Sequence, residues 1–189
     1  MTRITLSLVA LATLAACATA NEPTVTAYDV DLAMFEARRI SDLPLTGTSD
    51  LPSGGVRYDG QLGADVSGDA QGSILGDMTM LVDFGDNDIG GSVTNINLID
   101  PNGEPNQRFD GSLRIDGREN SGRLDAFASG EISGVDNDGY AVDSQMLLVL
   151  DGDVYDDTGR GDAVFGSATG TATGDFNMTV NGVFFGTAD

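Results

Sequence analysis

The chain contains no histidine, no lysine and no tryptophan, and it has a single cysteine, Cys17. One cysteine excludes an intramolecular disulfide. Without histidine, the usual general base, the commonest metal ligand and the serine–histidine–aspartate triad are all missing. Carboxylates, tyrosine and arginine remain as chemical groups. We therefore expect a protein that is not an enzyme and that has no cofactor.

Charge of one sign dominates the composition. Nine basic residues, all of them arginine, stand against 30 acidic ones, and the formal net charge is −21. A field of this sign repels nucleic acid and anionic lipid headgroups. It favours solubility, a cationic partner or a high-salt habitat. Among so many acids, carboxylate pairs of the glycosidase kind arise by chance, and no tryptophan is present to form a sugar platform.

The first residues have the organisation of an export signal. Arg3 supplies the positive charge, and an apolar stretch from Ile4 to Leu14 is too short to span a bilayer as a helix. The stretch ends in Leu14-Ala15-Ala16-Cys17, which resembles the lipobox of bacterial lipoproteins. Residues 1–16 are therefore predicted to be a lipoprotein signal peptide. The alternative is an ordinary signal peptide that is cleaved near Ala18–Ala20.

The lipobox resemblance implies that Cys17 is acylated, for example with palmitate, and becomes the first residue of the mature protein. Alanine rather than aspartate at position 18 favours the outer membrane. Residues 17–28 then form the lipidated cysteine and a short tether. The tether, roughly Ala18 to Thr26, reaches at most about 30 Å. The expected partner at this end is the membrane itself.

A composition boundary separates one helix from the rest. All 26 glycines follow position 46, and before that point apolar residues recur at helical spacing. We predict a helix over Asp31–Asp42, capped by Asp29 or Asp31, within a segment 29–44 that packs on the domain behind it. Arg38 and Arg39 form a partner contact or a solvated helix face. The apolar positions are Val30, Ala33, Met34, Ala37 and Ile40.

From Gly54 onward the hydrophobic period changes to two, which is typical of strands. Short turns rich in Asp, Asn and Gly separate the runs and imply antiparallel neighbours. The outward positions are rich in Asp, Thr, Asn and Arg, which argues against a barrel in lipid. Residues 51–189 are therefore predicted to form an all-β, eight-stranded, antiparallel up-and-down soluble β-barrel. The eight runs are Val56–Asp65, Ile74–Phe84, Ile89–Ile99 with a bulge near Asn95-Ile96, Phe109–Asp116, Gly122–Ile132, Tyr140–Leu150, Ala163–Thr173 and Phe176–Phe185.

Five short motifs resemble the barrel domains of transferrin-binding protein B. They are Leu51–Gly60, Leu81–Phe84, Ile89–Val93, Ala163–Gly170 and Asn181–Gly186. The family includes surface lipoproteins that bind host proteins, and many single-barrel relatives. The resemblance implies the barrel fold and display at the cell surface rather than on the periplasmic face. The chain lacks the family's companion handle domain and second lobe, so no transferrin-binding residues are carried over.

Acidic loops suggest calcium, because Ca²⁺ takes six to eight oxygen ligands. The best candidate site is at the start of the predicted loop Gly152–Gly161. Its possible ligands are Asp151, Asp153, Asp156 and Asp157. No EF-hand spacing is present. The alternative is that these residues serve tight turns, which need Asp, Asn and Gly for their backbone geometry.

Two groups of apolar residues are candidates for binding a partner or a ligand. Phe127, Phe165 and Phe184 lie on the face opposite their neighbours' inward residues, and together they would form a partner patch. The alternative is that they pack against the helix. Methionines of the strands either line a ligand pocket or fill the core: Met78, Met80 and Met146.

These patterns together predict an outer-membrane-anchored lipoprotein that acts as a binding or interaction module on the cell envelope. A protein partner of unknown identity is expected, and no nucleic acid. Two alternatives stay open: an acidic structural envelope protein without a specific ligand, and a barrel that carries a small apolar ligand as lipocalins do.

Overall fold

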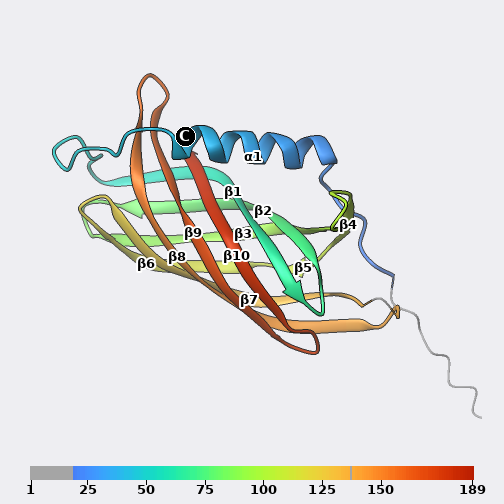
Figure 1. Cartoon of the computed structure of the whole chain (residues 1–189). Coiled ribbons are helices and arrows are strands. Elements are labelled where there is room, and N and C mark those ends of the chain that lie inside the picture. Colours follow the sequence, from blue (N-terminus) through green and yellow to red (C-terminus); the bar gives the residue numbers. More distant parts are fainter. Residues whose placement is uncertain (1–18, 137) are drawn as a thin grey trace, which may run out of the picture.

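The computed structural model describes residues 19–136 and 138–189. Within them, one helix lies along the outside of a barrel of antiparallel strands (Figure 1). The fold class predicted from the sequence, one short helix followed by an eight-stranded antiparallel barrel, is confirmed. No helix in these ranges is long and apolar enough to cross a membrane. Cys17 and the predicted signal peptide lie outside the described residues.

Helix α1 (Ala27–Ser41) begins four residues earlier than the prediction. Its N-cap is Thr26, not Asp29 or Asp31. The Thr26 hydroxyl accepts a hydrogen bond from the Asp29 amide, and the Asp29 carboxylate accepts one from the Thr26 amide at 2.8 Å. This reciprocal capping box satisfies backbone donors of the first turn. Asp29, expected as a cap, therefore serves as the third helical residue.

Eight long strands form the barrel wall, and each pairs with the next of these eight along the chain, while β10 pairs with β1. The order around the wall is β2-β1-β10-β9-β8-β7-β6-β3, and β3 pairs with β2. The short strands β4 and β5 add to β3 and β7. The bounds are β1 (Gly55–Gly68), β2 (Gly72–Asp83), β3 (Asp88–Ile99), β4 (Pro105–Arg108), β5 (Asp110–Gly111), β6 (Leu113–Asn120), β7 (Arg123–Val135), β8 (Ala141–Asp157), β9 (Gly161–Gly174) and β10 (Met178–Ala188).

Three local predictions meet different outcomes. The bulge expected near Asn95-Ile96 is confirmed, since the β2–β3 register shifts there and Asn95 has φ 52°. The predicted run Phe109–Asp116 is wrong in its extent, because the chain divides into β5 and β6. The predicted loop Gly152–Gly161 is also wrong. Pairing with β9 continues β8 to Asp157 and leaves three residues for the turn.

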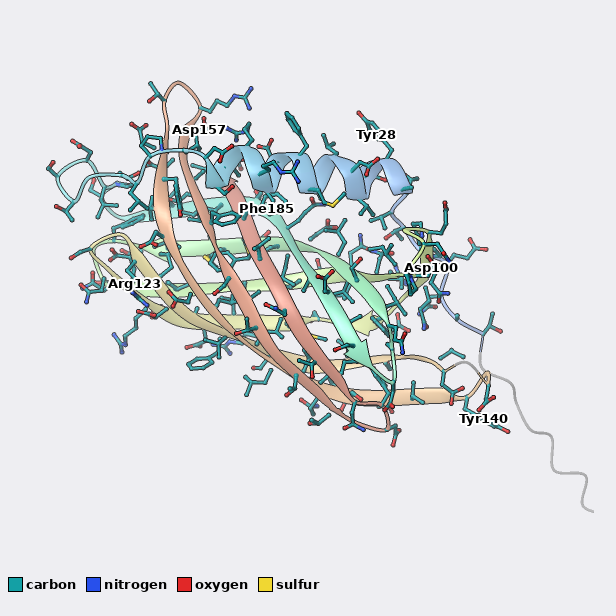
Figure 2. All side chains as sticks on the ribbon, viewed as in Figure 1. Tyr28, Asp100, Arg123, Tyr140, Asp157 and Phe185 are labelled. Carbon is teal, nitrogen blue, oxygen red and sulfur yellow. The ribbon has the colours of Figure 1, made fainter. Side chains whose placement is uncertain are left out.

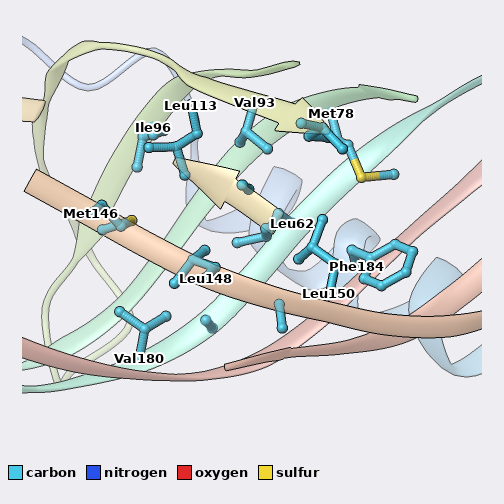
Figure 3. Close-up of a cluster of buried hydrophobic side chains, with 14 of the residues drawn as sticks. Leu62, Met78, Val93, Ile96, Leu113, Met146, Leu148, Leu150, Val180 and Phe184 are labelled. Carbon is cyan, nitrogen blue, oxygen red and sulfur yellow. The ribbon is translucent and has the colours of Figure 1, made fainter. Parts of the chain in front are cut away.

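Inward side chains fill the barrel, and none in this core is more than 8 % exposed. Figure 3 shows Met78, Met146 and Phe184 in the packed interior. Met80 is likewise fully buried. Of the two readings of the strand methionines, the structure therefore supports core filling.

Small residues make room for the largest inward ring. The cross-strand neighbours Gly152 and Gly166 face Phe184, and a Cβ on either would lie within 2.7 Å of its ring. Glycine at these two positions lets the ring pack directly against the backbone.

Helix α1 covers strands β1, β9 and β10 with a second apolar cluster. Ala33 and Ile40 of the helix pack with Phe185 of β10 and Ala163 of β9. Hollows of about 210 Å³ and 430 Å³ follow the two flanks of the helix. The helix therefore stands out from the wall as a ridge.

The segment before α1 is attached to the barrel rather than free. The Arg108 amide donates to the Asn21 carbonyl at 3.1 Å, and the Thr24 amide donates to the Asn97 side-chain oxygen at 2.9 Å. We call these contacts the N-terminal clamp. The predicted tether of residues 17–28 is therefore fixed from Asn21 onward.

Candidate functional site

The predicted phenylalanine patch does not exist, because its three members face different surroundings. Phe184 is fully buried inside the barrel. Phe165 packs under the helix, where its ring meets the Tyr155 ring edge to face at 6.2 Å. Phe127 alone is exposed, at 54 %. The expected alternative, packing against the helix, holds for Phe165.

The predicted calcium ligands lie on strand β8 and diverge. The Asp151 carboxylate is exposed and accepts two hydrogen bonds from Arg123, each at 3.0 Å. Asp157 is buried and pairs with Arg39 of α1, while Asp156 is exposed. Asp153 is half-buried on the outer wall. Across residues 19–136 and 138–189, no three Cys, Asp or Glu side chains gather as a metal ion requires.

Four large apolar side chains of α1 are exposed, and the sequence patterns did not predict this. Tyr28, Leu32 and Phe35 are 72 %, 51 % and 64 % exposed, and Met34 on the same helix is 55 % exposed. The first three recur at i, i+4 and i+7 and so share one face. We call Tyr28, Leu32 and Phe35 the outer stripe. Met34 lies nearer the packing face, where it lines a hollow together with Val30 and Ala37.

The outer stripe lies opposite the face that packs on the barrel. Helical geometry places Tyr28, Leu32 and Phe35 on the far side from Ala33 and Ala37. Figure 2 shows Tyr28 on the side of α1 away from the barrel. Met34, one of the apolar positions noted in the sequence, is exposed. The spacing of Tyr28, Leu32 and Phe35 was the signal for a second apolar face.

Charged side chains border the outer stripe. The helical period places Asp29 and Glu36 along one flank, and Asp31 and Arg38 along the other. Hydrogen bonds from the Thr26 hydroxyl and amide lower the pKa of the Asp29 carboxyl, which stays ionised. The border is therefore mostly negative.

Arg39 holds the helix against the barrel wall. It contacts Glu36 on its own helix at 2.7 Å and Asp157 of β8 at 2.9 Å. Hydrogen bonds to Glu36 and the ion pair with Asp157 raise the pKa of Arg39. Of the predicted basic pair, Arg39 is thus a structural contact.

A second, smaller apolar surface lies on β7 and β8. Phe127 pairs with Val149 across the two strands, and Leu147 lies diagonally beside them. Leu147 and Val149 are 53 % and 46 % exposed. We call these three residues the side patch.

On the outer wall, arginines are neutralised locally by aspartates two residues further along the chain. Such pairs are solvent-exposed and contribute little stability, but they remove positive charge from the surface. The acidic excess is thus what a partner meets. The pairs are Arg57–Asp59 at 2.8 Å, Arg108–Asp110 at 3.6 Å, Arg114–Asp116 at 3.1 Å and Arg123–Asp125 at 3.3 Å.

One end of the barrel carries a hollow of about 310 Å³, which we call the mouth. Its floor includes the stacked rings of Phe109 and Phe176, whose centroids are 5.8 Å apart. Asp100 and Asp136 at its rim accept backbone hydrogen bonds of their own turns. These carboxylates are therefore part of the turn structure.

Tyr58 is the one fully buried tyrosine among the described residues, and its hydroxyl has no hydrogen-bond partner there. Burial raises the pKa of this hydroxyl. It therefore stays protonated at neutral pH and is not a general base.

Comparison with known protein families, curated proteins and solved structures finds no match for this chain. The resemblance to the transferrin-binding protein B barrels stays a prediction from the sequence motifs.

Proposed function

We propose that the protein is an outer-membrane lipoprotein, anchored through Cys17, that acts as a non-enzymatic interaction module on the cell surface. Its binding element is the outer stripe of α1. The lipobox supports the anchor, and the order of lipobox, helix and glycine-rich barrel supports a single-barrel relative of the transferrin-binding protein B family.

One observation carries the proposal: α1 is apolar on two opposite faces. A helix that only packs against the outside of the barrel wall needs one apolar stripe. Here Val30, Ala33 and Ile40 serve the wall, and Tyr28, Leu32 and Phe35 face water. Contiguous exposed apolar side chains on a soluble domain mark interaction sites.

The shape and charge of the ridge define the partner. A helix that presents side chains at i, i+4 and i+7 fits an apolar groove of another protein. Asp29 and Asp31 on the two flanks complement basic residues at the rim of such a groove. The occupant is therefore a protein with an apolar groove edged by arginine or lysine.

The filled interior does not favour the alternative of a lipocalin-like carrier, since a carrier needs internal space for its ligand. The alternative of an acidic structural protein without a specific ligand does not explain why the apolar side chains of the outer stripe are exposed to water. Exposure of four large apolar side chains on one helix disfavours that alternative.

Leu32 and Leu81 offer a matched pair for the test, because each is a leucine that is 51 % exposed, one on α1 and one on β2. Leu32→Gln retains helix propensity while it removes the apolar contact. A leucine buried at an interface contributes about 2 kcal/mol, which corresponds to roughly 30-fold in affinity.

A photoreactive amino acid at Phe35 in intact cells captures the partner, and the adduct is identified by mass spectrometry. We expect one dominant adduct that Leu32→Gln weakens and Leu81→Gln leaves unchanged. Equal yields in both variants would contradict binding through the outer stripe. Protease treatment of intact cells tests display: cleavage only after permeabilisation of the outer membrane would contradict the surface location.

A further inference from the structure

The N-terminal clamp fixes where the chain leaves the barrel. Asn21 bridges to Arg108 of β4, and Thr24 is held by Asn97 of β3. Ala20 lines the mouth together with residues of β3 and of the β7–β8 turn. The described chain begins at that end of the barrel (Figure 1).

Chain length then limits where an anchored Cys17 can lie. Four residue steps separate Cys17 from Asn21, and a fully extended chain of that length reaches about 14 Å. Strand β8 alone has 17 residues and a length of about 56 Å, which a strand tilt near 40° reduces to about 40 Å along the barrel axis. The far end of the barrel is out of reach.

We propose that the clamp orients the barrel on the bilayer, with the mouth facing the lipid headgroups and the β8–β9 turn pointing away. This inference rests on the proposed lipid anchor. Figure 2 shows Asp100 and Tyr140 at the mouth end and Arg123 and Asp157 at the other. Tyr140 is 65 % exposed.

The chemistry of the mouth end fits one class of lipid surface. Asp100 and Asp136 at the mouth and Asp138 in the β7–β8 turn put negative charge there. An anionic surface repels them, whereas a zwitterionic aminophospholipid surface has no net charge to repel them and offers ammonium groups as partners. The exposed Tyr140 ring suits the headgroup layer, where aromatic residues with a polar tip reside.

The orientation also explains how the outer stripe is presented. Helix α1 starts six residues after Asn21, at the mouth end, and runs along the barrel away from it. When the membrane lies at the mouth, Leu32 and Phe35 on the side of the barrel stay accessible to a protein partner. The same membrane position leaves the side patch accessible.

The two ends of β8 provide a matched pair of labelling sites. Ala141→Cys and Thr158→Cys lie at the two ends of the strand and leave Tyr140 in place, and acylation of Cys17 leaves each variant with one free thiol. The full-length acylated protein is reconstituted in vesicles of phosphatidylethanolamine and phosphatidylcholine. Energy transfer from a fluorophore at each site to a headgroup-labelled lipid measures its distance from the bilayer. We expect the Thr158→Cys label to lie about 40 Å farther away than the Ala141→Cys label.

A flexible insertion tests the role of the short reach. About 20 glycine and serine residues between Ala18 and Thr19 extend the reach by about 25 Å on average. We expect the insertion to reduce the difference between the two labels.

Three outcomes overturn the orientation: equal distances in the protein without the insertion, a Thr158→Cys label nearer the bilayer, or a difference that the insertion does not alter. Flotation with vesicles and the mass of the N-terminal peptide report on the anchor separately. A chain that floats and is acylated but shows no difference refutes the orientation alone. A chain that is not acylated refutes the proposed anchor and the orientation together.

Discussion

Arg39 connects α1 to the barrel, and replacing it should loosen the helix that bears the outer stripe. Arg39→Met keeps the apolar stem and removes the charge. The change leaves the carboxylate of Asp157, a residue 6 % exposed, without its cation. Glu36 loses its partner as well, but it is the more exposed of the two carboxylates.

The magnitude follows from the burial of the pair. A hydrogen bond to a charged group contributes about 1.5–3 kcal/mol, and an exposed ion pair contributes at most about 1 kcal/mol. The side chains of Arg39 and Asp157 are 22 % and 9 % exposed, nearer the buried case. We expect Arg39→Met to cost about 2 kcal/mol and Asp157→Asn about 1 kcal/mol. The double variant Arg39→Met/Asp157→Asn should cost less than the sum of the two single variants, because it leaves no buried carboxylate without its cation.

Urea unfolding followed by circular dichroism measures the free energy of the whole fold. Hydrogen exchange at the α1 amides measures helix release, which can precede barrel unfolding. A loss of 2 kcal/mol corresponds to roughly 30-fold faster exchange. The matched control is Arg114→Met, whose pair with Asp116 spans 3.1 Å with side chains 81 % and 74 % exposed.

We expect the control to stay within about 0.5 kcal/mol of the natural sequence. Two results would refute the reasoning. One is an equal cost for Arg39→Met and Arg114→Met. The other is α1 exchange that does not change when Arg39 is replaced.

Three further predictions concern the cap, a half-buried acid and the core. Thr26→Ala removes the helix cap and should cost about 1 kcal/mol, seen as faster exchange in the first turn of α1; unchanged exchange contradicts it. Burial raises the pKa of Asp162, although a hydrogen bond from Thr46 opposes this. Its folded-state pKa therefore exceeds its unfolded value, so the ionised carboxylate destabilises the fold at neutral pH, and this cost fades as the pH falls through the folded pKa. Asp162→Asn should raise the melting temperature at pH 7 and lose that advantage below the ordinary pKa of 3.8; an equal gain at both pH values contradicts it. Phe184→Ala leaves a cavity over Gly166 that no side chain fills, and urea unfolding should report a loss of about 3–5 kcal/mol. A loss below about 1 kcal/mol would show that the barrel collapses around the site.

The strand pattern was readable from the sequence where one face of a strand meets water. On β7, Leu124, Ala126 and Ala128 alternate with exposed residues, and the run was predicted within a few residues of its bounds. Alternation is a local property of the extended backbone, so it needs no knowledge of neighbours. The break near Asn95 was visible for the same reason.

The pattern failed where both faces of a strand are buried. On β10, Phe184 points into the barrel and Phe185 points under α1, and both are buried. Alternation vanishes there, so the sequence did not distinguish the core residue from a surface residue. At Asp151–Asp157, turn-forming residues suggested a loop, but pairing with β9 overrode that preference.

The sequence by itself determined the class of the domain, its acidic charge, the absence of histidine chemistry and the candidate acylation site at Cys17. The tertiary structure decided which apolar residues remain exposed, because exposure depends on what each face packs against. Tyr28, Leu32 and Phe35 are apolar in any context, but only the position of α1 on the wall leaves them in water. The clamp at Asn21 likewise depends on contacts with residues more than 70 positions away, which no local pattern encodes.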